Sequence, residues 1–530
     1  MRGAQVNPDR RVRSMDRAGI PAAALLLGAV AAGVLLLATP HGLGIASDSV
    51  AYLGGAANLL AGRGFSRLSG GGTIEPLTHF PPFYSLTLAG LGRLGIEPIA
   101  GARWANAALL GCLVFGIVFA IRRLGASSAS AVAAGAFAAA SPILFEVSGW
   151  ALSEPLFLVL GLAGLVLLEE GLRKHNLRHC FFAGVLVGLA YLTRYVGVAL
   201  VVAGVARILL VTDRSPRQKR AAIAIFLGAS LAPLALWLGR NWLLTGTLTN
   251  RTLAWHPLTI TKWKAPFQLV WSWLLPLKFT WLALQIMLVA LGLGILAVGW
   301  KIRGKVRASL PRVVEGARRG GLAAGLAVFA SVYTLAVLAS LLWVDAATPV
   351  DQRIASPVYV CALILAVTGA DRLWGRAGTR VRWALLATGI LILASYVSRT
   401  WVLMKEYQRD GQGYASEGWR QSGAVAAVRR LPDSLLLYTN NPEAVYFFAG
   451  HGAYGLPQPF NSVTGRPVDD FAVRLDAVRA ALAGSGGAVI VFQSPGSESE
   501  IRSLAPLLGD LQPYYEGSDG TVRLGVGKDG

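Results

Sequence analysis

Residues 20–39 read IPAAALLLGAVAAGVLLLAT, an unbroken apolar stretch. About 20 consecutive apolar residues cross the hydrocarbon core of a bilayer as a helix, and they exceed the apolar core of a cleavable signal peptide. Arginines precede this stretch at positions 10, 11, 13 and 17. Positive charge before a first span favours a cytoplasmic N-terminus. The stretch is therefore predicted to be an uncleaved membrane anchor.

Similar apolar runs recur to about residue 400. Of the 530 residues, 54% are apolar and 15% are charged, with a mean hydropathy of +0.54. Soluble proteins carry about 25% charged residues. The formal net charge of +21 would suggest nucleic acid in a soluble protein, but the basic residues lie mostly in short loops between apolar runs. The composition excludes a nucleic-acid partner and predicts a multi-pass protein of the cell membrane.

The remaining spans are predicted from apolar runs of suitable length, and with the first span they number about eleven. They lie at residues 98–121, 127–145, 150–170, 180–193, 195–212, 221–243, 281–300, 322–344, 353–370 and 381–400. Threading them alternately puts about twice as many Lys and Arg residues in the cytoplasmic loops as in the external ones. This topology places the N-terminus inside and the C-terminus outside.

Three regions follow from this threading: a basic cytoplasmic N-terminus (1–19), a transmembrane domain (20–404) and a soluble extracytoplasmic domain (405–530). The first external loop, residues 40–97, is predicted to contain interfacial helices. In the last region LLLYTN and AVIVFQ are typical of strands, and DDFAVRLDAVRAALAG of an amphipathic helix. The fold class is an all-α polytopic membrane protein with a small α/β C-terminal domain.

Several common chemistries find no support in the sequence. The three cysteines, Cys112, Cys180 and Cys361, lie in or beside apolar segments without CxxC spacing, which argues against disulfides and zinc sites. The sequence contains no Walker A loop, no GxGxxG after a strand and no GxSxG. We therefore expect no ATP hydrolysis.

Asp48 is the sharpest candidate for catalysis. It lies nine residues beyond the first span, on the predicted external face. A carboxylate in a partly dry cleft there could take a proton from an acceptor hydroxyl. The alternative is that Asp48 only caps the helix that begins beside it, and on the residue alone capping is the commoner role.

Other ionisable residues gather at the predicted outer ends of spans. Glu154, in GWALSEPLFLVLGL, is either functional or a solvated loop carboxylate. Arg194, Arg240 and Arg353 lie outside against the positive-inside bias, where they either snorkel to the interface or clamp a phosphate. His79 precedes a Pro-Pro pair and is either a substrate contact or a residue of a turn that only separates two structural elements. The three arginines together favour an anionic substrate at the external face.

An ordered set of stretches runs through the chain. It comprises SDSVAYLGGAANLLAGRGF (47–65), HFPPFYSLTLAGLGRLG (79–95), ALSEPLFLVLGLAGLVLLE (151–169), GLAYLTRYVGVAL (188–200), RNWLLTGTLTN (240–250) and YTNNPEAVYFFAGHGAYGLP (438–457). This set resembles the C-type (GT-C) superfamily of integral-membrane glycosyltransferases. The resemblance is to the branch with protein O-mannosyltransferases and the lipid A aminoarabinose transferase. It covers the membrane region well and the tail loosely.

The resemblance implies an inverting glycosyltransferase, hexosyl- or pentosyltransferase, with a polyprenyl-phosphate sugar as donor. The acceptor would be a glycan, lipid or protein of the cell envelope. Asp48 matches the catalytic base and Glu154 a second acidic position. Arg194, Arg240, Arg353, His79, Tyr52 and Arg63 are the candidates for binding the donor and its phosphate. Asp48 is followed by Ser49 rather than by a second acidic residue, so no metal site is assigned and the need for a divalent cation stays open.

Two other functions remain as alternatives. A transporter or flippase for a lipid-linked sugar would usually show repeats and ionisable groups at the middle of the bilayer. Here the charges gather at the ends of spans, and we find no repeat. A non-catalytic scaffold of an envelope complex is the third interpretation, and an intact Asp48 argues against it weakly.

Overall fold

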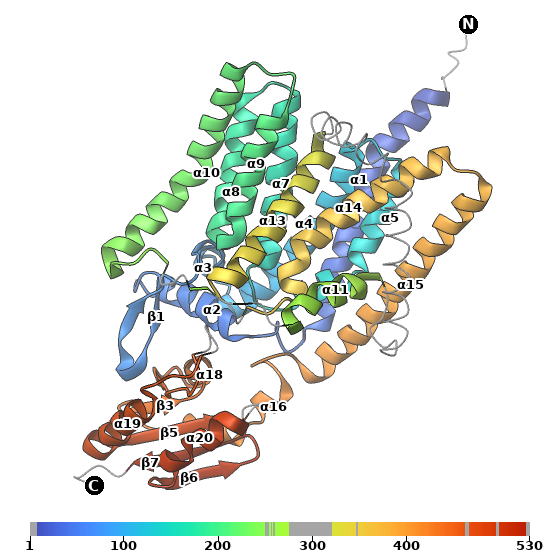
Figure 1. Ribbon diagram of the computed structural model, residues 1–530. Helices are drawn as coiled ribbons and strands as arrows, with labels where there is room; N and C mark the ends of the chain where they lie inside the picture. Colours follow the sequence, from blue (N-terminus) through green and yellow to red (C-terminus); the bar gives the residue numbers. More distant parts are fainter. Residues whose placement is uncertain are drawn as a thin grey trace, which may run out of the picture.

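The protein is described here from a computed structural model. It describes residues 8–249, 254–255, 257, 260–274, 321–345, 348–461, 466–493 and 498–525. A bundle of long helices fills one end of the molecule, and a small sheet with its own helices fills the other (Figure 1). The polytopic, mainly helical fold class predicted from the sequence is confirmed.

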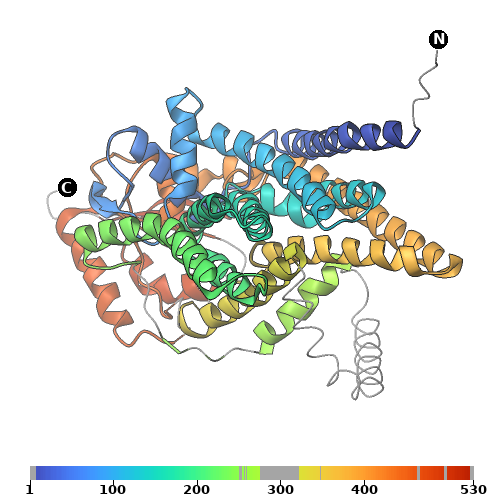
Figure 2. The same cartoon turned by 90° about the horizontal axis from the view of Figure 1, so that it is seen from above.

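Seven helices of the described residues are long and apolar enough to cross a membrane. They are α1 (Pro8–Ala38), α4 (Pro98–Arg123), α7 (Glu154–Arg173), α10 (Pro216–Thr245), α13 (Gly321–Trp343), α14 (Gln352–Arg376) and α15 (Thr379–Asp410). Only 6% of the apolar window of α15 is buried, and both views show this helix at the outer edge of the bundle (Figures 1 and 2). Its apolar face is therefore left for lipid.

Three of the predicted spans, at 127–145, 180–193 and 195–212, correspond to helices that are broken or short. Helices α5 (Ser128–Ala139) and α6 (Pro142–Ser148) meet at 51° and together are long enough for an eighth span. The break is local chemistry, because Ser141 caps α6 by accepting the N–H of Leu144 and Pro142 has no N–H to continue α5. Helices α8 (Leu177–Thr193) and α9 (Val198–Leu210) are short and joined by the 3₁₀ turn η2 (Tyr195–Gly197).

The number of eleven spans is not confirmed. The described residues give seven spans, or eight with the bent pair, besides the two shorter apolar helices. The predicted span at 281–300 lies outside the described residues. Helix α11 (Ile260–Leu274) lies in the predicted external region 244–280.

The segment between α1 and α4 forms a compact unit. It contains α2 (Ser47–Leu60), a hairpin of β1 (Ser66–Leu68) and β2 (Ile74–Pro76) around the turn η1 (Gly70–Gly72), and α3 (Phe83–Arg93). Buried side chains of α2 and α3 share one core with the C-terminal region.

The C-terminal region carries a five-stranded sheet in the order β4-β3-β5-β7-β6. Its strands are β3 (Leu437–Thr439), β4 (Tyr454–Gly455), β5 (Gly487–Phe492), β6 (Gln512–Gly517) and β7 (Gly520–Gly525), and its helices are α16 (Glu417–Arg420), α17 (Gly423–Val428), α18 (Pro442–Ala449), α19 (Phe471–Ser485) and α20 (Glu498–Leu508). Strand β5 is buried along its whole length, as expected for a central strand covered on both faces.

The tail, residues 411–525, is joined to the first loop by backbone hydrogen bonds as well as by side chains. The N–H of Tyr414 donates to the carbonyl of Ile45 at 2.9 Å, and the N–H of Ile45 donates to the carbonyl of Gln412 at 3.3 Å. The tail and the start of α2 are therefore held in fixed register. Figure 1 shows α18 beside α2 and the β1–β2 hairpin.

Candidate active site

Asp48 lies in the first turn of α2, where the helix dipole favours a negative charge. The residue at the N-cap is Ala46, and the hydroxyl of Ser49 accepts the N–H of Ala46 at 3.0 Å. Asp48 therefore does not cap the helix. Its side chain is 42% exposed, and its Oδ2 accepts a hydrogen bond from Nη2 of Arg353 at 3.1 Å.

Glu154, at the start of α7, is buried and lies between two arginines. Its Oε1 accepts from Nε of Arg353 at 2.8 Å and is 2.5 Å from Nη1 of Arg194. Its other oxygen, Oε2, is buried and has no hydrogen-bond partner among the described residues. A buried carboxylate is costly unless it is paired, so the two guanidinium groups explain why Glu154 stays at this position.

Arg353 joins the two carboxylates into one network. It lies in the first turn of α14, and its guanidinium contacts Asp48 with one nitrogen and Glu154 with another. Arg194 comes from the end of α8. Four of the residues predicted from the sequence, on four different helices, thus form the ion cluster Asp48–Arg353–Glu154–Arg194. Its formal charge is zero.

Tyr52 of α2 contacts the residue that precedes Glu154 of the ion cluster. Its hydroxyl lies 3.1 Å from the hydroxyl of Ser153, the residue before Glu154, and its ring packs edge-on against Phe80 and Tyr84. Burial raises the pKa of the Tyr52 phenol, so the group stays protonated. Tyr52 is thus a fixed spacer between α2 and α7, and it does not line the cavity described next.

A cavity of about 730 Å³ opens beside Asp48, between the first loop and the tail. Asp48 and His79 line it from the first loop, and the residues that the tail contributes are Pro442, Glu443, Tyr446, Ala453, Tyr454 and Gly455. This volume is within the usual range for small-molecule sites, about 300–1,000 Å³. The cavity therefore has Asp48 on the side of the first loop, and Glu443 and the aromatic side chains of Tyr446 and Tyr454 on the side of the tail.

Arg240 does not join the cluster. Its guanidinium donates to the backbone carbonyls of Phe65 and Leu77 at 2.8 and 2.9 Å, and it stacks on Trp237 at 4.9 Å. These contacts fix the strands of the hairpin against α10. Arg63 is exposed and lines no part of the cavity.

Sequence reasoning missed the ion pair of the hairpin and the tail side of the cavity. Arg67 and Glu75 face each other across β1 and β2 and are 3.0 Å apart. Burial opposes ionisation of Glu75, but hydrogen bonds from Ser69 and Arg67 outweigh it and lower the pKa of Glu75. The signal available was the alternation of charged residues in SRLSGGGTIEP. Tyr446 and Tyr454 lie in the tail stretch 438–457 that contributed to the resemblance, but neither was singled out as a site residue.

No group of three or more His, Cys, Asp or Glu residues with metal-binding geometry occurs in the described ranges. The cluster beside the cavity contains two carboxylates, and both are engaged by arginine. The chemistry available from these side chains is proton transfer and binding of anions.

These features define a class of protein: a polytopic membrane protein with a carboxylate-bearing cavity between its first loop and an α/β tail. Residues 79–237 match the family model described as dolichyl-phosphate-mannose-protein mannosyltransferase. No curated protein gives a significant match in sequence.

Solved structures share the fold over nearly the whole chain. ArnT from Cupriavidus metallidurans bound to undecaprenyl phosphate is 15% identical with a TM-score of 0.55, over 94% of this chain and 97% of that one. Archaeal oligosaccharyltransferase AglB from Archaeoglobus fulgidus, in complex with an inhibitory peptide and a dolichol-phosphate, is 11% identical with a TM-score of 0.59, over 97% and 75%. The chain therefore shares the fold of ArnT and AglB, and the match to the mannosyltransferase family model agrees with the resemblance noted in the sequence.

Proposed function

We propose that the protein transfers a sugar from a polyprenyl-phosphate donor to an acceptor hydroxyl at the extracytoplasmic face of the cell membrane. The observation that carries this proposal is the half-exposed carboxylate of Asp48, held by Arg353 at the edge of the cavity between the first loop and the tail. The binding of undecaprenyl phosphate by ArnT and of dolichol-phosphate by AglB supports a lipid-linked donor.

In the proposed reaction Asp48 acts as the general base. Oδ2 is held by Arg353, so Oδ1 receives the proton of the acceptor hydroxyl. The acceptor oxygen then forms a bond to the anomeric carbon from the face opposite the phosphate, and the bond from that carbon to the phosphate oxygen breaks. The configuration at the anomeric carbon is inverted, and the polyprenyl phosphate leaves with the electron pair of the broken bond.

The net charge of the ion cluster changes during the proposed reaction. Before the reaction Asp48 and Glu154 neutralise Arg194 and Arg353. Once Asp48 takes the proton, the cluster has a net charge of +1, and Arg353 loses one of its two anionic partners while it keeps its contact with Glu154. We propose that Arg353 then stabilises the leaving phosphate, with which it can form charge-assisted hydrogen bonds. Glu154 would act by holding the two arginines, rather than by contacting the sugar.

The tail would form the acceptor side of the site. Glu443, Tyr446 and Tyr454 line the cavity opposite Asp48. Aromatic faces and a carboxylate suit an acceptor rich in C–H faces and hydroxyl groups, such as an envelope glycan or glycolipid. The proposed membrane orientation has the N-terminus in the cytoplasm and the tail outside the cell.

Gly54 tests the role of the tail side. It lies on α2 in the cavity wall, and a Cβ there would be 2.9 Å from Cε1 of Tyr446. Gly54→Leu should therefore displace Tyr446 and fill the cavity, and we expect a loss of transfer of about 10-fold or more, as for other misplaced sites. The control is Gly90→Leu, on α3, where a Cβ meets no atom within 4 Å. Equal transfer by both variants would contradict the proposed acceptor position.

Release of free polyprenyl phosphate tests the function itself. Purified wild-type protein would be supplied with a panel of polyprenyl-phosphate sugars and with envelope extract as the acceptor source. We expect release with at least one donor, together with labelled sugar on an acceptor. If every donor binds without release, and reconstituted protein moves the donor across vesicles, the chain is a flippase and the proposal is wrong.

A further inference from the structure

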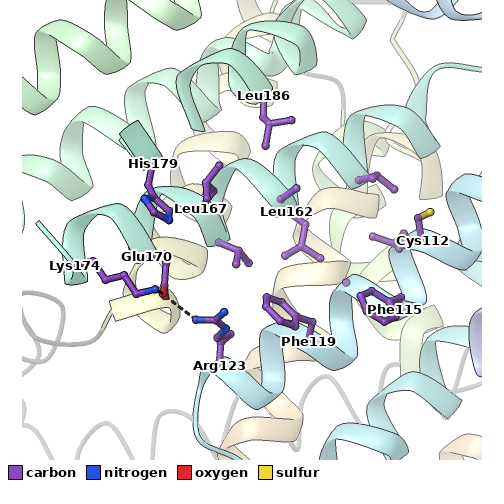
Figure 3. A pocket seen from close by; sticks show the side chains of 15 residues that line it. Cys112, Phe115, Phe119, Arg123, Leu162, Leu167, Glu170, Lys174, His179 and Leu186 are labelled. Atoms are coloured by element: carbon purple, nitrogen blue, oxygen red, sulfur yellow. Dashed lines mark hydrogen bonds and ion pairs between the residues drawn. The ribbon is translucent and has the colours of Figure 1, made fainter. Parts of the chain in front are cut away.

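A second cavity lies in the membrane bundle, away from Asp48. It is a groove of about 470 Å³ between α4, α7 and α8. Its walls are mostly apolar and include Phe115, Phe119, Leu162 and Leu167. Figure 3 shows the apolar side chains along the groove and the polar ones gathered at one end. The groove has the shape of an apolar channel with a charged mouth.

The charged mouth is built around Glu170. Arg123 and Arg173 lie 2.8 Å from its carboxylate, and Lys174 lies 2.7 Å from it. The guanidinium of Arg123 also stacks on Phe119, a residue of the groove, at 4.7 Å. Three cations share one anion, so the mouth has a net charge of +2.

A polar group in the mouth also has unused bonding capacity. His179 lines the groove, and its Nδ1 is buried without a hydrogen-bond partner among the described residues. The mouth thus has positive charge that Glu170 does not neutralise and a ring nitrogen that can still form a hydrogen bond. Both complement the anionic headgroup of a lipid whose acyl chain would lie in the apolar groove.

The mouth is far from the candidate active site. Glu170 is 16 residues after Glu154 on the same helix, a distance of about 24 Å at 1.5 Å per residue. It therefore lies near the opposite membrane face, on the side of the basic loops after α4 and α7. An occupant of the groove would be separate from any donor at Asp48.

We propose that this groove binds an anionic glycerophospholipid of the bilayer. Its phosphate would lie against Arg123 and Lys174, and an acyl chain would follow the groove between α4, α7 and α8. Basic pockets between transmembrane helices are known to hold anionic headgroups, with about 1 kcal/mol for each basic residue near the surface. The proposal does not depend on the sugar-transfer activity.

The test measures lipid binding to the full-length protein in a neutral detergent. Phosphatidylglycerol and phosphatidylcholine with the same chains are titrated separately, and bound lipid is counted by native mass spectrometry. We expect the double variant R123Q/K174Q to bind phosphatidylglycerol about 30-fold more weakly than wild type, the effect of two charges worth about 1 kcal/mol each. The control R217Q/R220Q removes two exposed arginines of α10 outside the groove and should bind as wild type.

A second variant keeps the charges and removes the space. Ala163 is exposed in the groove, so Ala163→Phe should block the acyl chain, whereas Ala22→Phe on the exposed face of α1 should not. Cys112 lines the groove and is exposed, whereas Cys180 and Cys361 are buried, so bound phosphatidylglycerol should slow alkylation of Cys112. The proposal would be wrong if the two lipids bound equally, or if either groove variant bound phosphatidylglycerol as the wild type does. It would also be wrong if only undecaprenyl phosphate protected Cys112.

Discussion

Asp48→Asn is expected to reduce sugar transfer by about 10²–10⁴-fold, the range that a general base contributes. The amide keeps the shape of the side chain but cannot take the proton of the acceptor hydroxyl. Arg353 keeps its contact with Glu154, so the variant should fold and should still bind the donor. The measurement is the release of polyprenyl phosphate at saturating donor, together with the thermal unfolding temperature of the purified protein.

Asp469→Asn is the matched control, because it makes the same chemical change at an exposed position of the tail. It should transfer sugar as the wild type does. If Asp48→Asn retained wild-type turnover in a protein with an unchanged unfolding temperature, Asp48 would not be the base. The proton would then have to leave through another group on the cavity wall, such as His79 or Glu443.

Glu154→Gln is expected to affect both stability and turnover. The change removes the buried charge that holds Arg194 and Arg353 and leaves two guanidinium groups close together. Breaking a buried ion pair in this way costs about 3–5 kcal/mol. Since Arg353 is no longer fixed beside Asp48, we also expect turnover to fall by about 100-fold, as for a misplaced catalytic group.

Affinity for the lipid product separates positioning from a general structural role. Removing the negative charge raises the formal charge of the cluster from zero to +1, so Glu154→Gln should bind undecaprenyl phosphate at least as tightly as wild type while turning over slowly. Glu154→Asp should recover part of the turnover because it restores the charge. Glu97→Gln, at the exposed start of α4, is the control for a change at the outer end of a helix. Loss of lipid binding by Glu154→Gln would assign Glu154 to folding alone.

Much of the fold could be predicted from local patterns. The long apolar runs at 98–121 and 322–344 correspond to α4 and α13 because the bilayer selects length and hydropathy directly. The strand pattern AVIVFQ likewise corresponds to β5. The count of eleven is not confirmed, because the predicted spans at 180–193 and 195–212 correspond to α8 and α9, which are shorter than the other spans. The predicted span at 127–145 is broken into α5 and α6 by capping at Ser141.

The candidate site divides in a similar way. The sequence singled out Asp48, Glu154, Arg194 and Arg353 as charges at the outer ends of spans, and the structure brings all four into one cluster. Arg240 gave the same signal, yet its guanidinium is used by the carbonyls of Phe65 and Leu77. A charge at the end of a helix reveals its depth in the membrane and says nothing about which group it meets.

The sequence by itself therefore determined that the chain spans a membrane repeatedly, that its charges lie at the ends of its helices, and that Asp48 begins a helix after the first span. Tertiary structure alone decided that Arg353, 305 residues away, lies against Asp48, and that Tyr446 of the tail lines the cavity beside Asp48. The physical reason is the range of the interactions. Hydropathy and capping act between neighbours in the chain, whereas an ion pair or a cavity wall depends on how distant helices pack.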